Sequence, residues 1–133
     1  MRPETERWLR YSGEDLVTAR VTFAGNRWAA TSFYAHLAAE KALKAIWVEG
    51  KALAPPRTHD LVRLAEELGL PADWLDELDA LSRVYLVSRY PEASADEALP
   101  YGIDEPAAQG HLLVAERVVA WAQQRLSTAS SSG

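Results

Sequence analysis

Three side chains that could form one site are spaced four residues apart in the stretch FYAHLAAEKALKA, residues 33–45. On a helix, His36, Glu40 and Lys44 would share one stripe, so that a carboxylate lies between an imidazole and an ammonium group. One interpretation is a solvated ladder of ion pairs, which contributes roughly a few tenths of a kcal/mol per pair. The other is a site between packed helices, and the choice depends on the charges that neighbouring helices supply.

A second group of polar residues interrupts an apolar pattern in VYLVSRYPE, residues 84–92. Pro91 breaks the helix there, which places Arg89 at its end. A guanidinium group at that position could bind the Glu40 carboxylate with two parallel hydrogen bonds. We therefore expect Glu40 and Arg89 to form a structural ion pair between two helices, largely withdrawn from solvent.

His59 follows Thr58 at a predicted helix start, where it is either a capping or packing residue or part of a functional site. In the functional interpretation, cationic side chains form a pocket for a nucleotide phosphate, and the helix N-terminus adds affinity for the anion. His111, between Gly110 and Leu112, is best interpreted as a structural histidine. The candidate nucleotide-binding residues are Lys41, Lys44, His59, Arg89 and Tyr90.

The residue types present limit the chemistry available to the chain. There is no cysteine, so disulfides and thiolate zinc sites are excluded, and no two of the three histidines are at ligand spacing. The seven glycines are scattered and form no phosphate-binding loop. We expect no metal, no cofactor and no catalytic residue.

The composition is that of one globular domain: 133 residues, 48% hydrophobic and 25% charged. No apolar stretch is long enough to span a membrane, so we expect a soluble, cytoplasmic protein without membrane contact. Residues 1–63 carry a net charge of +3 and residues 64–133 one of −8. This asymmetry reflects either differently solvated faces or surfaces that orient self-association. An acidic chain is not expected to bind duplex nucleic acid.

Apolar residues recur at helical spacing almost throughout, and no segment alternates with a period of two. The sequence therefore predicts an all-α fold, an antiparallel up-and-down bundle of four long helices and one short one. A single domain spans residues 1–126, followed by a disordered tail at 127–133. The first two predicted helices span residues 3–23 and 27–49. A short third helix spans 58–69 and is capped by Thr58, and a fourth runs from Pro71 to the break at Pro91. After a loop at 91–103, a last helix is capped by Asp104.

Three segments, in this order and at these intervals, resemble the HEPN domain, named for higher eukaryotes and prokaryotes nucleotide-binding. They are AAEKALKA at 38–45, in a helix ended by Gly50, THDLVRLAEELG at 58–69 and SRYPE at 88–92. The resemblance covers roughly residues 10–126 and implies a helical bundle that dimerises and binds nucleotide. It also implies a minimal nucleotidyltransferase as partner, in some branches as a toxin–antitoxin pair.

Many HEPN proteins are metal-independent ribonucleases whose signature is an Arg and a later His with four to six residues between them. No Arg stands at that spacing before any of the three histidines. Residues 29–31, before His36, are Ala, Ala and Thr; residues 52–54, before His59, are Ala, Leu and Ala; and residues 104–106, before His111, are Asp, Glu and Pro. We therefore expect a non-catalytic binding module that acts with a nucleotidyltransferase. The alternatives are a ribonuclease with a displaced active site using His59 and Arg89, or a purely structural oligomer.

The chain also has five tryptophans, at positions 8, 28, 47, 74 and 121. Most should be in the core, but the alanine-rich central helix leaves little room, so one or two should remain for an interface. Pairing of two copies is the commonest way to cover an apolar surface patch. We expect a homodimer that buries at least about 1,200 Å² in total.

Overall fold

The protein is described by a computed structural model that covers the backbone of residues 1–89 and 100–131 and the side chains of 1–88 and 101–128. The expected all-α bundle is confirmed, and this part of the chain contains no strand. The long helices are α1 (Pro3–Ala24), α2 (Trp28–Lys51), α4 (Leu75–Arg89) and α5 (Glu105–Ser131), and α3 (Leu61–Leu68) is short. Two single 3₁₀ turns, η1 (Ala72–Trp74) and η3 (Pro100–Gly102), precede α4 and α5.

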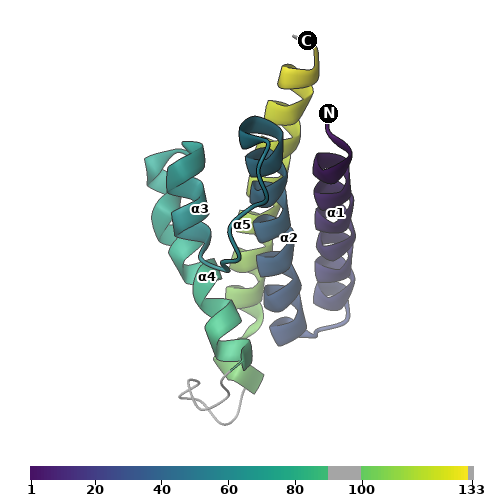
Figure 1. Cartoon of the computed structure of the whole chain (residues 1–133). Helices are drawn as coiled ribbons and strands as arrows, with labels where there is room; N and C mark the ends of the chain where they lie inside the picture. The colour runs from purple at the N-terminus through teal and green to yellow at the C-terminus, as the bar shows by residue number, and fades with distance from the viewer. Residues whose placement is uncertain (90–99, 132–133) are drawn as a thin grey trace.

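Helix α2 is the central element of the bundle. Figure 1 shows α1 along one side of α2, the α3–α4 pair on the other side, and α5 behind it. Small residues let α1 and α2 approach closely: Ser12 and Ala19 on α1 have no exposed surface, and the Ser12 hydroxyl donates to the Ala38 carbonyl oxygen at 2.7 Å. The fully buried alanines of α2 are Ala35, Ala38, Ala39, Ala42 and Ala45.

The connector between α2 and α3 crosses the face of α2 (Figure 1). Helix α2 continues past Gly50, where we expected its end, and stops at Ala52, whose φ of 54° is left-handed. The cap of α3 also differs from the prediction of Thr58. The Asp60 carboxylate accepts from the amides of Val62 and Arg63, while the Thr58 hydroxyl accepts from the Asp60 amide. A carboxylate directly before the first helical residue is the better-placed acceptor for these amides.

The N-termini of α1 and α2 have no side-chain cap, whereas α5 has the predicted one. Asp104 caps α5 as expected, since its Oδ1 accepts from the Ala107 amide at 3.0 Å. However, α5 continues to Ser131, into the tail at 127–133 that we expected to be disordered. Ala, Ser and Thr are compatible with a helix, and no proline or glycine precedes Gly133 in this tail. The predicted break at Pro91 and most of the predicted loop, residues 90–99, lie outside the described part.

The five tryptophans are all half-buried and pack against the core. None of them is fully interior, and none is detached from the core. A cation lies over the ring in four cases: Lys44 over Trp8 at 5.6 Å, Lys51 over Trp47 at 4.6 Å, Arg117 over Trp74 at 4.6 Å and Arg125 over Trp121 at 4.9 Å. Cationic side chains therefore cover much of the aromatic surface that we expected at an interface. Within the described residues, no helix is long and apolar enough to cross a membrane.

Candidate functional site

The centre of the candidate site is the Glu40 carboxylate, on the face of α2 that the connector crosses. Glu40 is only 4% exposed, and both of its oxygens have partners. Oε1 accepts a hydrogen bond from Nδ1 of His59 at 2.7 Å, and Oε2 accepts one from Nζ of Lys44 at 3.1 Å. The stripe on α2 is therefore a buried acid–base cluster and not a solvated ladder of ion pairs. We call His36, Glu40, Lys44, His59 and Tyr85 the Glu40 cluster.

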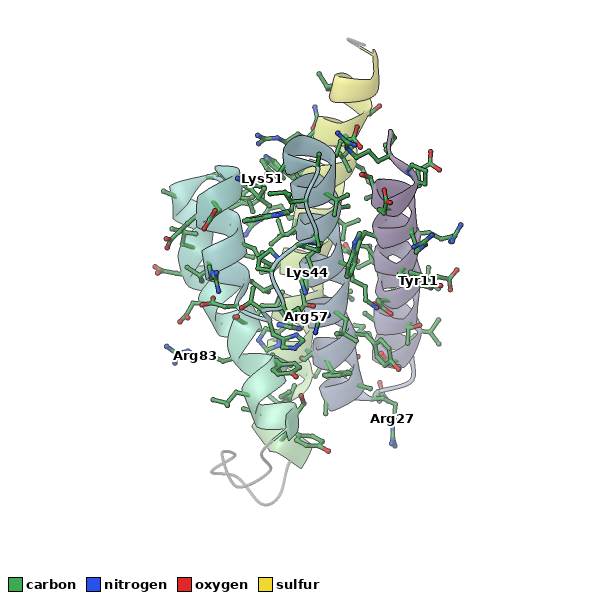
Figure 2. The ribbon with its side chains drawn as sticks, in the orientation of Figure 1. Tyr11, Arg27, Lys44, Lys51, Arg57 and Arg83 are labelled. Carbon is green, nitrogen blue, oxygen red and sulfur yellow. The ribbon has the colours of Figure 1, made fainter. Side chains whose placement is uncertain are left out.

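Lys44 is an internal partner of Glu40 and is itself 6% exposed. Figure 2 shows it on α2, where the connector passes in front of the helix. Its ammonium group is 5.6 Å from the centre of the Trp8 ring on α1, so the charge lies between a carboxylate and an aromatic face. Both contacts are attractive for an ammonium group and compensate for its loss of water. Lys44 is thus committed to the fold and has little surface left for a ligand.

His59, in the connector, is the member of the cluster that reaches solvent. Its ring stacks on Tyr85 of α4, with centroids 3.8 Å apart and planes 16° apart, and its side chain is 43% exposed. Its carbonyl oxygen is also held, because Nε2 of His36 donates to it at 3.0 Å and the Ser82 hydroxyl at 3.2 Å. The backbone, one ring nitrogen and one ring face of His59 are therefore fixed, while part of the ring remains open.

His36 supports the cluster from inside the bundle and has no exposed surface. With Nε2 donating to the His59 carbonyl, Nδ1 is unprotonated in the neutral ring and has no hydrogen-bond partner among the described residues, at 4.0 Å from Oε1 of Glu40. Burial lowers the pKa of His36 below its ordinary value of 6.5, although the His59 carbonyl and Glu40 act in the opposite direction. His36 is therefore a neutral, structural histidine near neutral pH.

The structure brings together two of the predicted nucleotide-binding residues, Lys44 and His59, which meet on Glu40. Lys41 is placed elsewhere: its ammonium group pairs with Asp15 of α1 at 2.6 Å and lies 5.8 Å from the Tyr11 ring centre. The amides at the start of α3 are not open to an anion, because side-chain oxygens of Asp60 and Ser82 accept their hydrogen bonds.

Arg89 is the last residue of α4, but its side chain and the whole of Tyr90 lie outside the described residues. The Glu40–Arg89 ion pair therefore stays a prediction. Its premise that Glu40 is withdrawn from solvent is correct, and the described side chains that bind the two Glu40 oxygens are Lys44 and His59. No sequence pattern indicated the Tyr85 contact, because stacking on His59 depends on the path of the connector.

One further sequence expectation, that His111 is structural, can be compared with the described residues. His111 is half-buried, and its Nδ1 is 2.7 Å from the Ser32 hydroxyl, which agrees with a structural histidine; burial lowers its pKa. In the described part of the chain, no group of three His, Asp or Glu residues is arranged to hold a metal ion.

The fold and the cluster define a class: a small all-α bundle whose central helix carries a buried carboxylate paired with a lysine and a histidine. The family model of the HEPN domain matches residues 5–126, and the chain belongs to this family.

Two solved structures are similar over nearly their whole length. The crystal structure of TT1696 from Thermus thermophilus has a TM-score of 0.80 at 24% identity, covering 92% of this chain and 98% of that one. The crystal structure of ST0689, described as an archaeal HEPN homologue, has a TM-score of 0.75 at 28% identity, covering 94% and 98%. No curated protein matches the chain.

Replacing Glu40 with Ala should lower the free energy of unfolding by about 3 kcal/mol, because Lys44 is then buried without its counterion. Denaturation in urea, followed by circular dichroism, measures this loss. The matched control is Glu116→Ala, which removes an ion pair with Arg20 whose side chains are 34% and 53% exposed. The control should cost less than about 1 kcal/mol. A loss below about 0.5 kcal/mol for Glu40→Ala would mean that Lys44 is solvated.

Acidification should destabilise the fold below the ordinary histidine pKa of 6.5, because burial lowers the pKa of both His36 and His111. Between the lowered folded values and 6.5, the unfolded chain binds protons that the folded chain does not. The free energy of unfolding then falls with falling pH, by at most about 1.4 kcal/mol per pH unit for each histidine.

Urea denaturation across this pH range measures the slope, and His111→Asn should make it shallower. Stability that is constant or rises on acidification would show that neither histidine is held neutral.

Proposed function

We propose that the protein is a non-catalytic HEPN module that binds the phosphate of a nucleotide beside His59 and acts with a nucleotidyltransferase partner. The observation that carries the proposal is the geometry of His59: its Nδ1 is bound to buried Glu40, one ring face is stacked on Tyr85, and the side chain is 43% exposed. A ring held in place loses little conformational freedom when it binds a ligand.

The charge balance of the Glu40 cluster leaves room for an anion. Lys44 already neutralises Glu40, so the buried carboxylate puts little net negative charge beside His59. Arg57 lies two residues earlier in the same connector (Figure 2) and is exposed, and among the described residues its side chain has no ion pair. An imidazole N–H and a guanidinium group on one connector, two residues apart in sequence, are both donors suited to phosphate oxygens. The Asp60 carboxylate is the nearest opposing charge in sequence, and it is engaged in capping α3.

Membership in the HEPN family supports the second half of the proposal, association with other chains. We propose a homodimer that forms a toxin–antitoxin-like pair with a minimal nucleotidyltransferase. The surface offers apolar residues on α1 and α5 for such contacts, since Tyr11 is 50%, Val17 52%, Val21 64% and Leu113 58% exposed. Large exposed apolar side chains on neighbouring helices are typical of surfaces that bind protein.

Isothermal titration with ATP tests the phosphate site directly. His59→Ala should weaken binding by about tenfold or more, because a charge-assisted hydrogen bond is lost. The matched control is Lys41→Ala, which removes a nearby cation that is paired with Asp15, and its affinity should stay within about twofold of the parent. Absence of ATP binding to the parent protein, or equal loss in both variants, would contradict the proposed site.

A second candidate function, RNA cleavage, is favoured by one contact. A carboxylate bound to Nδ1 of a histidine orients the ring for proton transfer through Nε2, and the 2.7 Å bond from His59 to Glu40 has this arrangement. The chain lacks the Arg that would precede a histidine, with four to six residues between them, and stabilise the developing charge. We therefore keep the binding module as the main proposal.

Purified protein should not cleave single-stranded RNA in the presence of a metal chelator, because no arginine precedes a histidine at the spacing of the family's ribonuclease motif. Gel analysis of a labelled RNA provides the measurement. Cleavage that is lost in His59→Ala and retained in Lys41→Ala would instead establish the ribonuclease alternative.

A further inference from the structure

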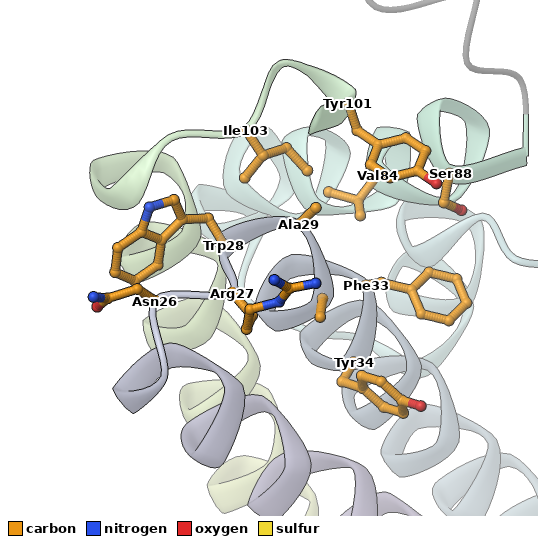
Figure 3. Close-up of a pocket in the computed structure, with 11 residues that line it drawn as sticks. Asn26, Arg27, Trp28, Ala29, Phe33, Tyr34, Val84, Ser88, Tyr101 and Ile103 are labelled. Carbon is orange, nitrogen blue, oxygen red and sulfur yellow. The ribbon is translucent and has the colours of Figure 1, made fainter. Parts of the chain in front are cut away.

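A cavity of about 520 Å³ lies at the opposite end of α2 from the connector, between the start of α2, the end of α4 and the segment before α5. This volume is typical of sites for small molecules. Figure 3 shows aromatic and aliphatic side chains around it. The apolar walls are formed by Trp28, Phe33, Tyr34, Val84, Tyr101 and Ile103.

Arg27 provides the only charged group among those lining residues that the structure describes. Figure 3 shows its guanidinium group pointing toward the side of Phe33, with the Trp28 indole on the other side of Arg27. The Arg27 side chain has no ion pair or hydrogen bond with a described residue, and no Asp or Glu stands among the described residues that line the cavity. An unpaired guanidinium group at an apolar cavity has its full hydrogen-bonding capacity available for an anionic ligand.

The charge and the walls together limit the class of ligand. One guanidinium group matches one carboxylate, which it can bind through two parallel hydrogen bonds. A doubly charged phosphate would be only half neutralised, and a sugar would bury hydroxyl groups against apolar walls without enough partners. Of the lining hydroxyls, that of Ser88 already donates to the Tyr85 carbonyl oxygen at 2.8 Å. The complementary ligand therefore has a single negative charge and an apolar body.

We propose that this cavity is a binding site for a small apolar monocarboxylic acid, whose carboxylate pairs with Arg27 and whose body lies between Trp28, Phe33 and Tyr101. The site is separate from the one beside His59 and shares no lining residue with the Glu40 cluster. The ligand also differs, since a nucleotide is multiply charged and polar. The carboxylate site therefore does not depend on the proposed function.

Isothermal titration with naphthaleneacetate tests the site, and naphthaleneacetamide is the matched neutral probe with the same apolar body. The parent protein should bind the acid about tenfold or more tightly than the amide, because only the acid forms a charge-assisted pair. Arg27→Gln should remove this preference and leave the affinity for the amide unchanged. The control Arg20→Gln replaces an exposed arginine of α1 that pairs with Glu116, and it should bind both probes as the parent does.

Three results would overturn the proposal. The first is that neither probe binds, and the second is that Arg27→Gln and Arg20→Gln have the same effect. The third is that the probe binds only when light scattering shows the particle mass to be halved. The probe would then displace a second copy of the chain, and the cavity would be part of a contact between two copies. Because ATP binding is measured separately with His59→Ala, failure here leaves the proposed phosphate site unaffected.

Discussion

A carboxylate buried in a helical bundle has to be paired, and the pairing of Glu40 determines how the elements around α2 are arranged. One oxygen is bound by Lys44 from the same helix, and the other by His59 from the connector. The connector contains Pro55 and Pro56 and has no regular hydrogen-bonded structure of its own. The contact with Glu40 therefore fixes its position over α2, and with it the start of α3.

The same contacts tie α4 to the central helix. The His59 carbonyl oxygen accepts from His36 of α2 and from Ser82 of α4, and the His59 ring stacks on Tyr85. Replacing a buried ion pair with apolar residues is often neutral or stabilising, so stability alone does not explain such a cluster. Its consequence here is a histidine that is rigid on one side and exposed on the other. This arrangement links the packing of the bundle to the site proposed for a phosphate.

The sequence was sufficient for the fold because helical periodicity, capping residues and prolines are local signals. It indicated each long helix, the Asp104 cap and the burial of Glu40. Of the two partners of Glu40, Lys44 followed from the helical spacing, but His59 did not, since it reaches Glu40 through a connector whose path no periodicity describes. Lys41 shows the converse: it is adjacent to Glu40 in sequence but turns about 100° away on the helix, and it pairs with α1. Contacts within a helix follow from spacing, whereas contacts between segments require the tertiary structure.

The central claim is that Glu40 and His59 form one energetically coupled unit, and a double-mutant cycle measures this coupling. The free energies of unfolding of the parent, Glu40→Gln, His59→Ala and the double variant give the interaction energy between the two side chains. The account predicts a coupling above about 1 kcal/mol, as expected for residues in one hydrogen-bond network. Additivity of the two single changes within about 0.3 kcal/mol would contradict it, because the contact would then contribute nothing to holding His59 in place.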